Sequence, residues 1–122
     1  DVNNIYVNSR NFGFDPQAYL AQLPLERTCY VHVAGHYVED DGLVIDTHGS
    51  DVIDPVWQLL QAAYQRMGHP VLTCLERDFN IPDLRTLTQE VSHIAHLQHQ
   101  AFGAQAVGQW GAQTHSVNRQ VA

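Results

Sequence analysis

The chain has 122 residues and is 44% hydrophobic, so it falls in the size range of one domain that can bury a substantial core. Its formal net charge is −7, which disfavours nucleic acid as a partner because a sequence-independent grip on phosphates needs a surplus of Lys and Arg. No apolar run approaches the roughly 20 residues that cross a bilayer, so we expect no membrane insertion. Cys29 and Cys74 each lie in an apolar run, which predicts two reduced, buried thiols and a cytoplasmic location.

The first third of the chain predicts a strand end, a loop, a helix and a strand. Asp1 and Val2 are expected to close a strand, and an Asn-rich polar loop follows as far as Gly13. Asp15 and Pro16 form an N-cap and a first-turn proline for a helix over residues 15–22. The run CYVHVA predicts a strand over residues 29–34 that is covered on both faces.

The rest of the chain predicts a helix, a strand and a longer helix after a polar loop. Asp54 before Pro55 is expected to cap a helix over 54–67, with Gly68 as its stop. A strand over 70–76 and a helix over 82–99 follow. We therefore expect residues 1–100 to form βα units of a parallel sheet, and residues 101–122 to be a tail that is loosely ordered or bound to a partner.

Ligand-type side chains follow each predicted strand. In βα folds the active site forms at the carboxyl ends of the strands, so these residues are expected to converge on one rim. Asp46 and His48 point the same way if their loop is extended. Carboxylates and imidazoles together favour Fe, Mn or Zn. The strand-end candidates are Asp1, Asn4, His32, His36, Glu76, Asp78 and Asn80.

Structural interpretations compete with this hypothesis. A single His near a strand end is more often a hydrogen-bonded structural residue than a ligand. Glu76 is harder to dismiss, because an acid that follows a buried strand needs a cation or a donor beside it. His93, His96 and His99 drift around a helix and have no acidic companion, so we expect them on the helix surface. No GxSxG motif and no glycine-rich phosphate loop is present.

Four ordered motifs also resemble a known family. The segments DVNNIYVN, HVAGH, IDTHGSDVIDPVW and LERDFNIPDL are similar to the C-terminal part of the domain-of-unknown-function 692 (UPF0276) family, over about residues 1–97. Its members include the methanobactin-biosynthesis oxidase. The resemblance implies a TIM (β/α)8 barrel similar to xylose isomerase, with two or three iron ions (Fe2+/Fe3+) at the strand ends.

The resemblance also implies which residues bind metal. It places five residues at metal-ligand positions: Asp1, His32, Asp46, His48 and Glu76. Of these, Asp46, His48 and Glu76 are expected to carry the catalysis. Asn4 stands where some relatives have a further His, so it is a candidate weak ligand or substrate contact. His36 matches a recurrent family His, and we favour His32 over His36 as the direct ligand because His32 lies within the strand.

A complete family member is about twice this length and contributes further ligands from its first half. We therefore expect this chain to be about half of a barrel, with the N-terminal half as its partner. The implied substrate is a Cys-containing precursor peptide, and a small peptide-recognition protein is a further candidate partner. The implied reaction is iron-dependent oxidation of Cys, either a four-electron oxidation or a carbon-excising rearrangement. The alternatives are a Zn or Mn isomerase or phosphodiesterase on the same barrel, and a non-catalytic half-barrel that only binds.

Overall fold

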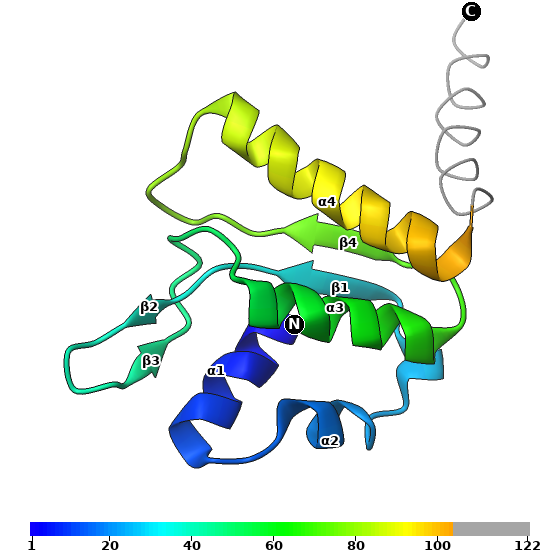
Figure 1. The fold of residues 1–122 in the computed structure, drawn as a ribbon, viewed down its shortest axis with the longest axis horizontal. Coiled ribbons are helices and arrows are strands. Elements are labelled where there is room, and N and C mark those ends of the chain that lie inside the picture. The colour runs from blue at the N-terminus through cyan, green and yellow to red at the C-terminus, as the bar shows by residue number, and fades with distance from the viewer. Residues whose placement is uncertain (104–122) are drawn as a thin grey trace, which may run out of the picture.

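The fold is that of a mixed α/β protein with a small parallel sheet (Figure 1), in a computed structural model that describes residues 1–103. Strands β1 (Tyr30–Val33) and β4 (Leu72–Leu75) pair in parallel, with His32 opposite Cys74. This pairing confirms the two predicted strands and their parallel arrangement. The closed barrel stays a prediction, since each of these strands has one neighbour among the residues described.

The first helix corrects the prediction for the N-terminal segment. Helix α1 (Val2–Phe12) replaces the expected strand end and Asn-rich loop. The side chain of Asp1 caps it by accepting a hydrogen bond from the Asn4 backbone N–H at 3.0 Å, and Gly13 ends it with a φ of 71°. Asparagine is a poor helix former, but buried Val2, partly buried Ile5 and Tyr6, and buried Ser9 recur at helical spacing, so packing overrides the local preference.

The other helices follow the predictions closely. Helix α2 (Pro16–Leu20) begins after Asp15, whose carboxylate accepts a hydrogen bond from the Gln17 backbone at 2.9 Å, and the 3-10 helix η1 (Leu25–Arg27) follows it. Helix α3 (Asp54–Met67) has the expected bounds, but its N-cap is Ile53 rather than Asp54. Asp54 is instead the first helical residue, where its negative charge interacts favourably with the positive N-terminal end of the helix dipole.

Helix α4 (Leu84–Phe102) begins two residues later than predicted, because the Asp83 side chain caps it by accepting a hydrogen bond from the Thr86 backbone at 2.8 Å. The first residues assigned to the tail belong to this helix. The remainder of that prediction, residues 104–122, lies outside the described residues. Among residues 1–103, no helix combines the length and the apolar character that a membrane span requires.

The long polar loop predicted after Ala34 contains an unpredicted hairpin. Strands β2 (Tyr37–Val38) and β3 (Val44–Ile45) pair antiparallel. The turn between them uses Gly42, whose φ of 91° suits a residue without a side chain. In Figure 1 this hairpin projects on the side to which the arrowheads of β1 and β4 point. The loops that carry the candidate ligands therefore lie beside the strand ends.

The core lies on one face of the parallel sheet. The side chains of Val33, Val56, Leu60 and Tyr64 are all less than 2% exposed and belong to one cluster between the sheet and helices α3 and α4. The same face of β4 presents Thr73, which contacts the Tyr64 hydroxyl.

The opposite face of the sheet is uncovered among the described residues. Its side chains alternate with those of the core face, and Tyr30 and Leu72 are each 51% exposed. Within residues 1–103, the expectation of strands covered on both faces is therefore met on one face only. Cys74 lies on this uncovered face and Cys29 precedes β1, so both thiols are free but exposed, contrary to the prediction that they are buried.

Candidate metal centre

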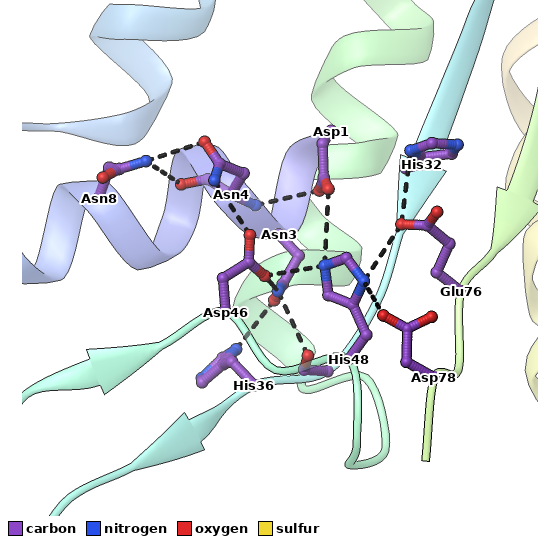
Figure 2. A network of polar contacts seen from close by, with 11 residues as sticks. Asp1, Asn3, Asn4, Asn8, His32, His36, Asp46, His48, Glu76 and Asp78 are labelled. Carbon is purple, nitrogen blue, oxygen red and sulfur yellow. Dashed lines mark hydrogen bonds and ion pairs between the residues drawn. The ribbon is translucent and has the colours of Figure 1, made fainter. Parts of the chain in front are cut away.

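The candidate ligands converge where four segments meet. Asp1 caps α1, His32 lies in β1, Asp46 and His48 follow β3, and Glu76 follows β4. Figure 2 shows their side chains turned toward a common centre. Asp1, His48 and Glu76 each offer a ligand atom, and these three atoms lie within 4.8 Å of one another. The predicted convergence on one rim is therefore present in the structure.

The imidazole of His48 is at the middle of this cluster. Its Nε2 lies 3.1 Å from Oδ1 of Asp46 and 3.8 Å from Oδ2 of Asp1. Its Nδ1 lies 3.3 Å from Oε2 of Glu76 and 3.4 Å from Oδ2 of Asp78. The Nε2 atom is buried and, despite the short distance to Asp46, is not in hydrogen-bonding geometry with any partner. A ring nitrogen beside carboxylates, without a directed hydrogen bond, suits a shared cation better than an ordinary hydrogen-bonded His.

The backbone holds His48 in an uncommon conformation. Its φ is 53°, in the left-handed region that few non-glycine residues adopt. Its N–H donates to the carbonyl of Gly35 at 3.1 Å, and its carbonyl accepts from the N–H of Asp78 at 3.0 Å. These two bonds fix the ring between the ends of β1 and β4. Strain of this kind persists only where the surroundings enforce it, and it is concentrated at functional sites.

Two glycines allow close packing around the loop that carries His48. Gly35 packs against Ser50, and Gly49 packs against Phe79. A Cβ on Gly35 would lie 2.0 Å from the carbonyl oxygen of Ser50, and one on Gly49 would lie 2.4 Å from the ring of Phe79. Only glycine fits at Gly35 without displacing backbone, whereas a side chain at Gly49 would displace the exposed ring of Phe79.

His32 and Glu76 form the second part of the cluster. Nδ1 of His32 lies 3.4 Å from Oε2 of Glu76, and both side chains are about a quarter exposed. The ring of Tyr30 packs edge-on against that of His32, with 4.6 Å between the centroids. His32 and Glu76 share the uncovered face because strand side chains alternate. His32 therefore lies beside a candidate ligand, and its role as the direct ligand in preference to His36 stays a prediction.

His36 lies one layer away from the cluster. Its Nδ1 is 2.9 Å from Oδ1 of Asn3, and its ring packs against Tyr6 with 5.1 Å between centroids. Burial lowers the pKa of His36, and the negative charge of Asp46 offsets part of that shift. His36 therefore contacts Asn3, which in turn contacts Asp46 of the cluster.

Two asparagines bind the Asp46 carboxylate from opposite sides. Asn3 Nδ2 donates to Oδ1 and Asn4 Nδ2 donates to Oδ2 at 3.0 Å. The side-chain oxygen of Asn4 accepts from Asn8 at 2.8 Å. Asn3, which is 0% exposed, is not among the candidates predicted from the sequence. The local signal for it is its place in the helical period of α1, a segment predicted as a loop.

The remaining candidates lie at the edge of the cluster. Asp78 is 68% exposed but reaches Nδ1 of His48. Asn80 has a φ of 51° and donates to the carbonyl of Gly49 at 3.2 Å, so its amide stabilises the turn instead of facing His48. The three histidines of the last helix, His93, His96 and His99, lie exposed on α4 as predicted. Trp57 packs against His93, with 4.7 Å between the ring centroids.

The donor set fits a divalent transition metal. Among the described residues, no arginine forms a salt bridge with Asp1, Asp46, Glu76 or Asp78, and the sequence contains no lysine. Several carboxylates this close together need positive charge between them. Carboxylate oxygens combined with imidazole nitrogens are the ligands of Fe, Mn and Zn.

This arrangement defines an α/β protein with a candidate metal centre at its strand ends, and comparison with known proteins gives its family. The chain belongs to the family described as RiPP precursor modification enzyme MbnB/TglH/ChrH, whose model matches residues 1–99. RiPPs are ribosomally synthesised and post-translationally modified peptides. This result confirms the resemblance found in the sequence.

Curated relatives agree with the family assignment. A UPF0276 protein of Shewanella amazonensis is 58% identical over 98 residues, which are 80% of this chain and 35% of that protein. A UPF0276 protein of Alcanivorax borkumensis is 57% identical over 98 residues, 80% of this chain and 32% of that protein. One from Pseudomonas aeruginosa is 51% identical over 105 residues, 86% of this chain and 37% of that protein. The chain spans about a third of the length of these relatives.

Proposed function

We propose that, in the complete protein, this chain supplies part of an iron centre that oxidises Cys residues of a ribosomally synthesised precursor peptide. The observation that carries the proposal is the cluster around His48, in which carboxylates approach both ring nitrogens and no arginine of the described residues compensates them. Membership of a family of peptide-modifying enzymes supports a peptide as the substrate.

Asp1, His48 and Glu76 are the residues that would hold the first ion, since their ligand atoms already lie within 4.8 Å of one another. Asp46 lies beside Nε2 of His48 and His32 lies beside Glu76, so each would contribute to a further position on its own side of the cluster. Iron, when bound, supplies the redox chemistry with dioxygen and an attachment point for a thiolate. A four-electron oxidation balances when the peptide loses four electrons and four protons and one dioxygen becomes two waters.

Residues of this chain would position a metal ligand and the bound peptide. The hydrogen bonds of the His48 backbone to Gly35 and Asp78 hold the ring in one position, so a bound ion meets a preorganised ligand. The uncovered sheet face, with Tyr30 and Leu72, would form one wall of the chamber that receives the peptide. The remaining walls would come from the N-terminal half of a TIM barrel, and a small peptide-recognition protein would deliver the precursor.

Metal analysis of the complete protein tests the proposal. We expect iron to copurify with the protein and to give anomalous scattering at the iron edge close to His48. We also expect a Cys-containing precursor peptide to lose mass corresponding to the oxidation only when dioxygen is present. The same peptide with Ser in place of Cys is the matched control and should stay unchanged. Activity that persists without iron would contradict the proposal.

Two other functions share the same geometry. A Zn or Mn isomerase or phosphodiesterase would work without dioxygen, so anaerobic turnover with Zn2+ or Mn2+ would favour it. A non-catalytic binding module would bind the peptide and leave its mass unchanged, with no metal in the complete protein. The carboxylates around His48 favour metal binding over this last function, because carboxylates this close together are stabilised by a cation between them.

A further inference from the structure

We propose that Asn3 and His36 are positioning residues that fix the orientation of the Asp46 carboxylate toward the metal centre. The inference rests on the proposed function, because it concerns the same centre. It also assigns a role to His36, which from the sequence is either a candidate ligand or a hydrogen-bonded structural residue.

The buried amide of Asn3 contacts polar groups of Asp46, Gly35 and His36. Its side chain is 0% exposed at the start of α1. Its amide nitrogen donates to Oδ1 of Asp46 and to the carbonyl of Gly35, the latter at 3.3 Å. Its amide oxygen lies 2.9 Å from Nδ1 of His36. Each polar atom of the amide therefore has a partner, as a buried polar group requires.

The partners allow only one orientation of this amide. Turning it over would place its oxygen against the Asp46 carboxylate and the Gly35 carbonyl, three acceptors with no proton between them. The contact with His36 restricts the proton on that ring as well. The amide oxygen of Asn3 can only accept a hydrogen bond, so Nδ1 of His36 must carry the proton and donate it. His36 thus acts on Asp46 through Asn3 and not by contact with an ion.

The carboxylate of Asp46 is held on both sides as a result. Asn3 donates to Oδ1 and Asn4 donates to Oδ2, while Oδ1 also faces Nε2 of His48 at 3.1 Å (Figure 2). Each oxygen keeps further lone pairs for an ion. Residues that orient a ligand in this way commonly change metal affinity by 10- to 100-fold when they are replaced.

Ferrous iron alone is the probe for this role. In the complete protein under anaerobic conditions, Fe2+ would be titrated against a competing chelator, and Mössbauer spectra would report the ligand field of each iron. Asn3→Leu keeps the side chain's size and removes the amide, and we expect its dissociation constant for Fe2+ to rise by about 10-fold or more. We expect the quadrupole splitting of one iron to change.

The His36 variants keep the test decisive if Asn3→Leu does not fold. His36→Leu removes the donor, whereas His36→Asn places an amide nitrogen where Nδ1 was. We expect His36→Leu to weaken Fe2+ binding by about 10-fold and His36→Asn to restore it to within about 3-fold of the parent. His96→Leu is the matched control, because it makes the same replacement on the exposed face of α4.

The outcomes separate this inference from the proposed function. A parent protein that binds no iron overturns the proposed function. Folded variants that bind Fe2+ like the parent, with only a lower melting temperature, overturn the positioning role alone. Equal losses in His36→Leu and His36→Asn also overturn it, because the restored donor would then have no effect.

Discussion

Two groups of carboxylates flank the end of β4, and their charges are balanced in different ways. On the helix side, Arg77 donates to Asp51 at 2.8 Å and to Glu90 at 3.0 Å, and its side chain is only 6% exposed. Glu90 also accepts from the backbone N–H of Val52 at 2.8 Å. Desolvation alone would lower the pKa of Arg77, but the hydrogen bonds and charges of Asp51 and Glu90 raise it instead.

On the other side of the same chain segment, Glu76 faces His48 and His32 with no arginine among its described partners. Adjacent side chains along an extended segment point to opposite sides, so Glu76 and Arg77 belong to different clusters although they are neighbours in sequence. One cluster carries its own cation, and the other carries carboxylates around an imidazole. This contrast supports the proposal that the Glu76 cluster binds a cation from outside the chain, whereas Arg77 itself is the cation of the other cluster.

The largest effect is expected from Glu76→Gln, which keeps the side chain's size and removes its charge. In the complete protein we expect loss of at least one iron and of peptide oxidation, while the fold remains. In the metal-free form we expect the free energy of unfolding to stay the same or to rise by up to about 1 kcal/mol, because repulsion among the carboxylates falls. Iron stoichiometry measures the loss of iron, and urea unfolding measures the free energy of unfolding. Retained iron together with a lower melting temperature would show that Glu76 is only structural.

Metal removal should have the next largest effect. A ligand at 100 times its dissociation constant stabilises the folded state by about 2.7 kcal/mol. We therefore expect a chelator to lower the melting temperature of the complete protein by several degrees and to have a much smaller effect on Glu76→Gln. Differential scanning calorimetry with and without chelator measures the change. Identical shifts in both proteins would place the metal elsewhere.

Arg77→Met tests the compensated cluster. It leaves Glu90 partly buried without its cation, and we expect a loss of about 2 kcal/mol in the free energy of unfolding, below the 3–5 kcal/mol typical of a fully buried pair because Asp51 is 72% exposed. Urea unfolding of the metal-free protein measures it. We therefore expect Arg77→Met to destabilise the metal-free protein and Glu76→Gln not to, and a comparable loss of stability in both variants would contradict the difference between the two clusters.

Asp51→Asn should have a small effect on the same cluster. The Asp51 side chain is exposed to water, so its ion pair with Arg77 is weakened by solvent screening. We expect a loss below about 1 kcal/mol in the free energy of unfolding, reduced further in high salt. A loss as large as that of Arg77→Met would mean that Asp51, and not Glu90, is the main partner.

His96→Gln should change neither quantity. His96 lies exposed on α4, where Nε2 of its ring lies 2.9 Å from the side-chain nitrogen of Gln100. We expect iron content and melting temperature to match those of the parent. A loss of iron in this variant would show that the exposed histidines of α4 take part in metal binding.

Much of the secondary structure could be predicted from local patterns. Asp15 with Pro16 marked α2, and the apolar spacing before Gly68 marked α3, because caps and helical periodicity are written within a few residues. Helix α1 was not predicted, because three asparagines within the first eight residues favour a loop while the spacing of Val2 and Ile5 is helical. The composition of a segment indicates its helix propensity, and tertiary packing can override that propensity.

The site was predictable only in part. The rule that strand ends carry ligands brought out Asp46, His48 and Glu76, since it depends on the order of elements along the chain. The role of Asn3 was not predictable, because its partner Asp46 is 43 residues away and no local pattern records that contact. Likewise, the exposure of Cys74 depends on which face of the sheet the helices leave uncovered.

Short motifs in the sequence were enough to predict α2, β1, α3, β4 and α4, the family and the chemical types of the candidate ligands. Only the tertiary structure decided that His32 faces Glu76 while His36 faces Asn3, and that Glu76 and Arg77 serve different clusters. The physical reason is that charge balance and burial depend on neighbours brought together by the sheet and the glycine-mediated loop contacts. Such neighbours are remote in sequence, so their pairing is fixed only when the chain folds.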